Sequence, residues 1–311
     1  MFFIKELIII ARIKKKLYKH SVEIIVEEYL NDCINRNLSS RTIELYKAHL
    51  DSFSMHIGVG YLEDITQEIL NCYLSNLNQW HNYSPTSYNN HCRFIRAFFN
   101  YAREKEYMGK LKVTYKKIDS KIQFTPDDLE VKRIIERPSL DVSYSYLSAW
   151  LACMIIVSTG TRVGAISNLK KSNVDLKGGT IIFTKTKQRK EMIVKMTPKL
   201  KKAISFFLDV TETNSEYLIC QQYTEEKLSD RVLSNNVKRF CASRGVPQAN
   251  AHSLRRYFSC SCLLSGMSIF ELSRHLGHSS LEVTQTYVKS LSNLDFEDNF
   301  MKMNPLERLK G

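Results

Sequence analysis

Residues 275–287 read HLGHSSLEVTQTY, and this short stretch does most to decide the fold of the chain. Ser279 and Glu282 have the spacing of a capping box, in which the two side chains satisfy free backbone N–H groups at a helix start. The pattern therefore predicts a helix that begins just after Ser279. His278 then precedes this helix, and Tyr287 lies on it nine residues after His278. Taken alone, a tyrosine on a helix is usually a core or interface residue.

A second motif, HSLRRY, occupies residues 252–257. On a helix, His252 and Arg255 are three positions apart and share a face, whereas Arg256 points elsewhere. A histidine beside an arginine suits a phosphate group, because the planar guanidinium matches phosphate oxygens and stays charged. A helix-start histidine with a surface arginine is the simpler explanation of this motif alone.

Residues 180–196 break the helical pattern. Residues 180–184 (TIIFT) and 192–194 (MIV) are rich in β-branched and apolar residues, which predicts two strands. The connection between them, KTKQRK at 185–190, is very basic. The sequence thus predicts a β-hairpin with a cationic turn, and a lysine on such a turn can reach a neighbouring site and donate a proton.

Further upstream, residues 159–164 read TGTRVG after a predicted buried helix over residues 146–158. Gly160 and Gly164 bracket Arg162 and allow a tight turn that presents its guanidinium. By itself such an arginine is more often part of a surface ion pair.

Together these stretches contain what metal-free cleavage of a phosphodiester needs: a nucleophile, cations on the non-bridging oxygens and a proton donor for the leaving oxygen. The sequence has no GxxxxGK[ST] loop and no evident carboxylate cluster for two metal ions. These absences agree with chemistry that needs no cofactor, no ATP and no metal, which is what the family resemblance given next implies.

The order of these motifs resembles the tyrosine recombinase (phage integrase) family, and the resemblance covers residues 20–290. It implies that Arg162 and Arg255 clamp the scissile phosphate. It implies further that Tyr287 is the nucleophile, forming a 3′-phosphotyrosyl intermediate and a free 5′ hydroxyl. It also implies that Lys185 is the general acid and that His252 assists proton transfer at Tyr287. His278 is implied to donate a hydrogen bond to the phosphate. Lys187 also fits as the general acid if the hairpin is aligned in the other register.

Two positions depart from the family pattern. The family commonly has glutamate three residues after the first arginine, where this chain has Ala165. The family commonly has HxLRH around the second arginine, where this chain has Arg256 at the last position. Neither departure removes a catalytic group, but Ala165 puts the positioning of Arg162 in doubt.

Residues 20–108 read as successive helices, and their apolar spacing and caps give the expected bounds. The predicted helices are Val22–Ile34, Arg41–Met55 capped by Ser40, Gln67–Leu77 capped by Thr66, and a last helix opened by Pro85 that continues over Thr86–Glu104. On the last helix, three arginines lie between the apolar residues of a core stripe: Arg93, Arg96 and Arg103. They line either a DNA backbone or a solvated helix face.

The expected fold class is mainly α with a small β-sheet, in two domains. We expect a basic N-terminal extension at 1–19, an all-helical core-binding domain at 20–108 and a basic linker at 109–123. A catalytic domain of mixed α and β structure follows at 124–290, and a tail at 291–311 is a candidate for docking on another protomer. Thr125 is the expected cap of the first helix of the catalytic domain, with Pro126 at its first position.

The 311 residues carry a formal net charge of +13, which suits nucleic acid first and a membrane surface second. The eight cysteines include no CxxC pair and no zinc-finger spacing, so reduced thiols in a cytosolic protein are expected. Neither the basic N-terminal stretch nor any other segment predicts a membrane partner.

The predicted function is that of a site-specific DNA recombinase or integrase, cytoplasmic and associated with the nucleoid, from a prokaryote or its mobile element. Expected partners are double-stranded DNA with short inverted sites, three further copies of the chain in a homotetramer, and possible accessory proteins. Two alternatives stay open: a type IB topoisomerase-like enzyme and a non-catalytic DNA-binding protein on the same fold. The DNA target and the outcome of recombination are not readable from the sequence.

Overall fold

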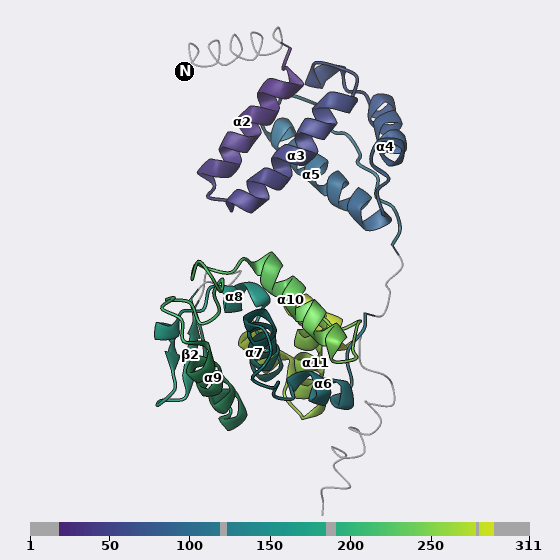
Figure 1. The fold of residues 1–311 in the computed structure, drawn as a ribbon. Coiled ribbons are helices and arrows are strands. Elements are labelled where there is room, and N and C mark those ends of the chain that lie inside the picture. Colours follow the sequence, from purple (N-terminus) through teal and green to yellow (C-terminus); the bar gives the residue numbers. More distant parts are fainter. Residues whose placement is uncertain (1–18, 119–122, 185–190, 278–279, 289–311) are drawn as a thin grey trace, which may run out of the picture. The chain divides into compact units, whose positions relative to one another are not determined.

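The computed structural model describes residues 19–118, 123–184, 191–277 and 280–288, mostly as α-helices with one small sheet (Figure 1). The chain divides into two compact units, residues 1–120 and residues 121–311, called unit 1 and unit 2 below. The predicted fold class, mainly helical with a small β-sheet, is confirmed.

Unit 1 is built from four α-helices and a short 3-10 turn among the residues described. Their bounds are α2 Val22–Asn35, α3 Ser40–His56, η1 Leu62–Asp64, α4 Gln67–His81 and α5 Pro85–Glu104. The predicted cap Thr66 is confirmed, since its side chain accepts a hydrogen bond from the Ile69 N–H. The predicted cap Ser40 is wrong, because Ser39 is the residue whose hydroxyl accepts from the Thr42 N–H.

The core of unit 1 is rich in aromatic side chains. Phe53 of α3 and Phe98 of α5 are fully buried, with ring centres 6.3 Å apart, and Tyr29 of α2 packs against Phe98 with ring centres 5.8 Å apart. A polar network lies beside these rings: His91 of α5 is buried and bonds to His49 and to the Tyr73 hydroxyl. The predicted apolar stripe of α5 therefore faces a core that also holds a buried imidazole.

The segment after α5 is bound to unit 1. The Gln67 side chain exchanges two hydrogen bonds with the backbone of Lys112, and the Asn89 side chain does the same with the backbone of Lys116. The Lys116 ammonium also lies 4.3 Å from the centre of the Tyr88 ring. The first part of the stretch that the sequence predicts as a linker thus packs on unit 1.

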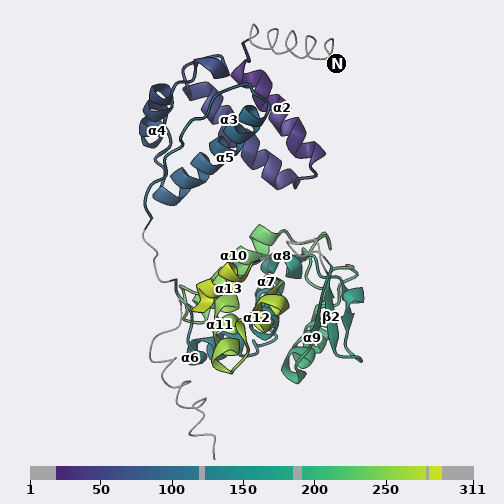
Figure 2. The same cartoon turned by 180° about the vertical axis from the view of Figure 1, so that it is seen from behind.

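Unit 2 is a helical body that carries a small sheet at one side (Figure 2). Its described elements are α6 Asp128–Ile135, α7 Tyr144–Thr159, α8 Val163–Ser167, η2 Lys171–Asn173, β1 Val174–Asp175, β2 Thr180–Phe183, β3 Met192–Lys195, α9 Pro198–Thr211, α10 Asp230–Ser243, α11 Ala251–Leu264, α12 Ile269–Leu276 and α13 Leu281–Val288. Helix α7 packs against α9, α10 and α11. Helices α6 and α8 also contact α7, so neighbouring helices cover it on several sides.

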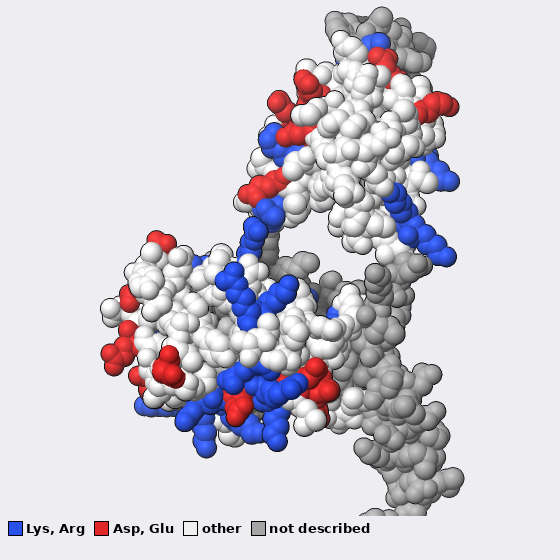
Figure 3. All heavy atoms as spheres, turned by 45° about the vertical axis from the view of Figure 1, so that its right-hand side comes forward, with Lys and Arg blue, Asp and Glu red and all other residues white. Residues whose placement is uncertain are grey.

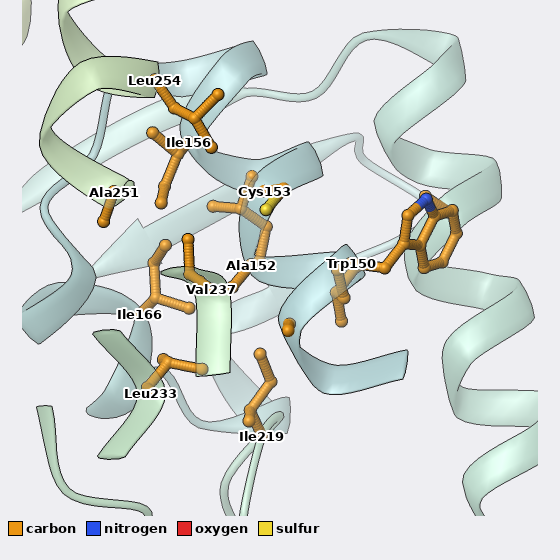
Figure 4. Close-up of a cluster of buried hydrophobic side chains, with 14 of the residues drawn as sticks. Trp150, Ala152, Cys153, Ile156, Ile166, Ile219, Leu233, Val237, Ala251 and Leu254 are labelled. Atoms are coloured by element: carbon orange, nitrogen blue, oxygen red, sulfur yellow. The ribbon is translucent and has the colours of Figure 1, made fainter. Parts of the chain in front are cut away.

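Helix α7 is apolar on nearly every face, as expected for a helix surrounded by others. Ala152, Cys153 and Ile156 are each fully buried, and Figure 4 shows them among Val237 of α10 and Leu254 of α11. Helix α7 ends at Thr159, which is also the first residue of the TGTR turn.

The start of unit 2 differs from the prediction. Helix α6 begins at Asp128, and its cap is Asp127 and not Thr125. Asp127 accepts from the Glu130 N–H, and the Glu130 carboxylate accepts from the Asp127 N–H, which is a complete capping box. The helix therefore starts where Asp127 and Glu130 can bond to each other's backbone, and not at Thr125 and Pro126.

The predicted hairpin is confirmed. Strands β2 and β3 pair antiparallel with Ile181 opposite Val194 and Phe183 opposite Met192. The sequence missed β1, a two-residue strand that pairs with β2 and makes the sheet three-stranded. The cationic turn at 185–190, with Lys185 and Lys187, lies outside the described residues.

Candidate active site

Arg255 and His252 lie on the first turns of α11, whose start is set by Asn250. The Asn250 side chain accepts hydrogen bonds from the N–H groups of His252 and Ser253, at 2.9 and 3.1 Å, and the Ser253 hydroxyl accepts from the Asn250 N–H. This capping box fixes the helix register. His252 and Arg255 are then three positions apart on one face, as the sequence predicts.

Arg255 is buried, with 5% of its surface exposed. Its guanidinium donates hydrogen bonds to the carbonyl of Gly160, at the end of α7, and to the carbonyl of Leu276, at the end of α12, the latter at 3.4 Å. A buried charge is costly unless it is hydrogen-bonded, and a helix C-terminus is a favourable place for a cation. Arg255 therefore joins α11 to the ends of two other helices.

Arg162 stands at the start of α8, directly after a sharp turn. Gly160 ends α7 in the left-handed conformation, with φ of +65°. A Cβ atom at Gly160 would lie 2.4 Å from the Phe258 ring and 2.8 Å from the Leu276 side chain, so only glycine fits. The turn places Arg162, which is half-buried, at the N-cap of α8.

Arg162 and Arg255 are neighbours, because Arg255 donates to the carbonyl of Gly160, which lies two residues before Arg162 in the chain. Partial burial lowers the pKa of His252 below its ordinary value, and the positive charges of Arg255, Arg256 and Arg162 lower it further. On α11, Arg255 follows His252 by three residues, so the two side chains share one face of the helix. At neutral pH His252 is neutral, and a neutral imidazole can accept a proton.

Tyr287 belongs to α13, which packs against α11 and α12 (Figure 2). Its helix is therefore next to the helix that carries His252 and Arg255. The side chain of Tyr287 lies outside what the structure describes, as do the residues Lys185, Lys187 and His278. The predicted helix after Ser279 is confirmed from Leu281 onward.

The two departures from the family pattern have structural explanations. Ala165, with 8% of its surface exposed, packs in the core of unit 2. Arg256 donates to the Phe124 carbonyl at 2.7 Å and to the Gln123 side chain. These hydrogen bonds connect the first described residues of unit 2 to α11.

The other end of α8 is held by a carboxylate. Asp230, the first residue of α10, accepts a hydrogen bond from the Ser167 hydroxyl. A Cβ atom on Gly164 would lie 2.5 Å from the Asp230 carboxylate, so glycine at this position permits the close approach. Asp230 is not predictable from the sequence, because nothing in its local pattern distinguishes it from an ordinary acidic residue at a helix start.

Arg93, Arg96 and Arg103 are exposed on α5, on the side away from the core. Arg93 donates a hydrogen bond to the Asn90 side chain at 2.8 Å, and both side chains lie on the surface of α5. On unit 2, lysine and arginine side chains gather along the end drawn lowest in Figure 3, with some acidic residues among them. Both units thus offer exposed cations.

Within the described ranges, no group of three or more histidine, cysteine or acidic residues is arranged to hold a metal ion. Among the same residues, no helix is both long enough and apolar enough to cross a membrane.

Comparison with known proteins places the chain in a family. The model of the phage integrase family matches residues 127–293, more than half of the 311 residues. The chain is 33% identical to tyrosine recombinase XerA of Thermococcus onnurineus (strain NA1) over 141 residues, which are 45% of this chain and 50% of that relative. It is 25% identical to XerA of Pyrococcus furiosus (strain ATCC 43587 / DSM 3638 / JCM 8422 / Vc1) over 289 residues, which are 92% of this chain and 96% of the relative.

A solved structure agrees at the level of the fold. A lambda integrase tetramer bound to a Holliday junction superposes with a TM-score of 0.67 at 17% identity, covering 90% of this chain and 80% of that one. The chain therefore belongs to the phage integrase family of tyrosine recombinases, and the predicted enzyme class is confirmed.

Proposed function

We propose that this recombinase cuts and rejoins DNA with Tyr287 as the nucleophile. The tyrosine oxygen attacks the scissile phosphorus and forms a phosphotyrosyl bond to the 3′ end of the DNA. The bond from phosphorus to the 5′ oxygen breaks, and that oxygen takes a proton and leaves as a hydroxyl. Attack by a 5′ hydroxyl of another strand reverses these steps, so that one phosphodiester is exchanged for another.

The observation that carries this proposal is that Arg255, on the same face of α11 as His252, donates to the Gly160 carbonyl in the turn that precedes Arg162. Two arginines beside one phosphate neutralise the charge that its non-bridging oxygens gain in the transition state. Arg255 is held in place by carbonyls at the ends of α7 and α12, so its position costs no rearrangement during the reaction.

His252 is suited to take the proton of the attacking tyrosine. Its pKa is lowered by partial burial and by the nearby arginines, so the ring is neutral at neutral pH. Tyr287 belongs to α13, and the packing of α13 against α11, the helix of His252, supports assigning both residues to one site.

Lys185, or Lys187 in the alternative register, is proposed to protonate the leaving 5′ oxygen, and His278 to hydrogen-bond the phosphate. These three assignments rest on the sequence pattern. A lysine on a hairpin turn suits a general acid, because its ammonium carries transferable protons on a long side chain.

The proposed partner is double-stranded DNA with short inverted sites, bound by four copies of the chain. A tetramer on a Holliday junction is described for lambda integrase, whose fold this chain shares. Exposed Arg93, Arg96 and Arg103 are proposed to contact the phosphate backbone from unit 1, the proposed core-binding domain. A role for the tail at 291–311 in docking protomers, a need for accessory proteins, and a location at the nucleoid in the cytoplasm stay predictions.

Covalent trapping tests the proposal. Wild-type protein is incubated in EDTA with nicked fragments of the DNA that flanks its gene, and SDS-resistant protein–DNA adducts are counted. The wild type should form an adduct and Tyr287→Phe should form none. Tyr223→Phe is a matched control, because Tyr223 is 92% exposed and has no proposed role, and it should react like the wild type. An adduct from Tyr287→Phe would refute the assignment of the nucleophile.

A further inference from the structure

The turn that carries Arg162 is held by a histidine that the proposed mechanism does not use. His275, the next-to-last residue of α12, has its Nε2 atom 2.9 Å from the carbonyl oxygen of Thr159. Thr159 is the last residue of α7 and is fully buried. Carbonyls in the last turn of a helix have no partner within the helix, so a donor from outside satisfies a group that burial would otherwise leave unpaired.

The chemistry of this contact defines the state of the imidazole. A carbonyl oxygen only accepts, so the Nε2 atom of His275 must carry the hydrogen. The ring is half-buried and lies against Phe258, with ring centres 5.4 Å apart. Phe258 is also the side chain that a Cβ atom at Gly160 would strike. His275 thus supports the turn both through its hydrogen bond and through this packing.

Two side chains therefore donate hydrogen bonds to consecutive carbonyls of the turn. His275 bonds to Thr159, and Arg255 bonds to Gly160. On the other side of Arg162, Ser167 at the end of α8 is bonded to Asp230. The family pattern would place a glutamate at position 165, but Ala165 has no polar side chain with which to position Arg162.

We propose that His275 is a positioning residue for Arg162, acting through the hydrogen bond from its Nε2 atom to the Thr159 carbonyl. The proposal rests on the proposed function, in which Arg162 clamps the scissile phosphate. His275 does not touch the reacting atoms in this account. Its effect is to fix the end of α7, and hence the start of α8, at the distance that the phosphate requires.

The first test needs no DNA. Hydrogen exchange of full-length protein is followed by mass spectrometry for the peptide that covers residues 159–166. His275→Leu keeps an apolar side chain of moderate size but removes the donor, and exchange in this peptide should become at least about tenfold faster. His275→Gln keeps an N–H at a similar reach and should exchange like the wild type. Phe270→Leu is a matched control on α12, since Phe270 is 67% exposed.

The second test is the rate of covalent adduct formation on the nicked DNA that the wild type cleaves. His275→Leu should be slower by roughly 10- to 100-fold, the cost of a small misplacement of a catalytic group. Its affinity for the same DNA should be unchanged, and His275→Gln should recover most of the rate. A rate of His275→Leu equal to the wild type would overturn the proposal, as would unchanged exchange of residues 159–166.

A double variant separates action through Arg162 from other routes. His275 also lines a hollow with Met192 and Ile193 of β3, the strand that follows the cationic turn. If His275 acts through Arg162, His275→Leu should slow an Arg162→Lys protein by less than about twofold. A full additional loss would assign the effect to the hairpin and overturn the proposal. Absence of any adduct from the wild type would refute the proposed function itself, and with it any role of His275 in cleavage.

Discussion

The stability of unit 1 should fall in mild acid because a histidine lies in its core. His91 is fully buried, with its ring nitrogens 2.8 Å from the His49 ring and 2.6 Å from the Tyr73 hydroxyl. Burial lowers the pKa of His91 to about 3, and the neighbouring histidines His49, His81 and His56 add to this effect. In the unfolded chain the same group has its ordinary pKa of 6.5.

The sign and size of the effect follow from these two pKa values. The folded pKa is the lower one, so the unfolded state takes up the proton first. Stability is therefore lost as the pH falls through 6.5, and the loss continues towards pH 3. Each pH unit in this window corresponds to about 1.4 kcal/mol, so going from about pH 7.5 to about pH 5 should lower the free energy of unfolding by about 2 kcal/mol.

His49 and Glu63 of unit 1 also have pKa values shifted from their ordinary ranges. The pKa of His49 is also lowered, mainly by burial, so its titration lowers stability as the pH falls. The pKa of Glu63 is lowered from 4.5, with hydrogen bonds from His20 outweighing the opposing effect of burial. Its stabilising contribution is lost only as the pH falls below that value, so it does not contribute between about pH 7.5 and about pH 5.

The assay uses the distribution of the two tryptophans. Trp80 lies in unit 1 and Trp150 in unit 2, and the sequence contains no others. In a Trp150→Phe protein, fluorescence therefore follows the unfolding of unit 1. For a domain of this size the urea slope is about 1 to 2 kcal/mol per molar, so the urea midpoint should fall by about 1 to 2 M between the two pH values.

A midpoint that does not move between the two pH values would refute the reasoning. The control is His91→Gln, which removes the titrating group and keeps an amide near Tyr73. This variant should be less stable at neutral pH, but its midpoint should depend less on pH than that of the parent. An equal pH dependence in both proteins would show that another group is responsible.

Three further predictions concern unit 2 and DNA binding. Arg255→Ala should slow adduct formation by at least about 10²-fold, because the transition state loses a positive charge. It should also lower the free energy of unfolding by about 1 to 3 kcal/mol, because the carbonyls of Gly160 and Leu276 lose their donor. Cleavage at the wild-type rate would contradict the clamp role. Gly160→Ala should destabilise unit 2 by about 2 kcal/mol or more, since the position combines a left-handed backbone with a steric clash. Urea unfolding in a Trp80→Phe protein, in which Trp150 is the fluorescent tryptophan, measures this loss. DNA affinity measured by fluorescence anisotropy should fall steeply as the salt concentration rises. If Arg93 contacts a phosphate, Arg93→Gln should reduce the slope of log affinity against log salt concentration by about 1. An unchanged slope would mean that Arg93 contacts no phosphate.

Much of the secondary structure is predictable because its signals are local. Helix α5 begins at Pro85 and ends at Glu104 as predicted, since the early proline and the apolar stripe act within one element. The hairpin is predictable for the same reason, from β-branched residues on both sides of a charged turn.

The errors concern choices between chemically similar candidates. Ser39 and Ser40 are both serines, and only the backbone conformation decides which one caps α3. At the start of unit 2, Asp127 becomes the cap because Glu130 completes a reciprocal pair with it. Strand β1 is too short to have a pattern of its own and exists because β2 lies beside it.

By itself the sequence determined the order of the motifs, their residue types and the helices and hairpin that carry them, because these depend on neighbours in the chain. Only the tertiary structure decided that Arg255 and His275 donate to the turn before Arg162, and that Arg256 bonds to the start of unit 2. Residues 159 and 275 lie far apart in the chain, and their hydrogen bond forms because α7 ends among the helices packed around it. Such contacts leave no periodic signal in the sequence, since they depend on how whole helices pack.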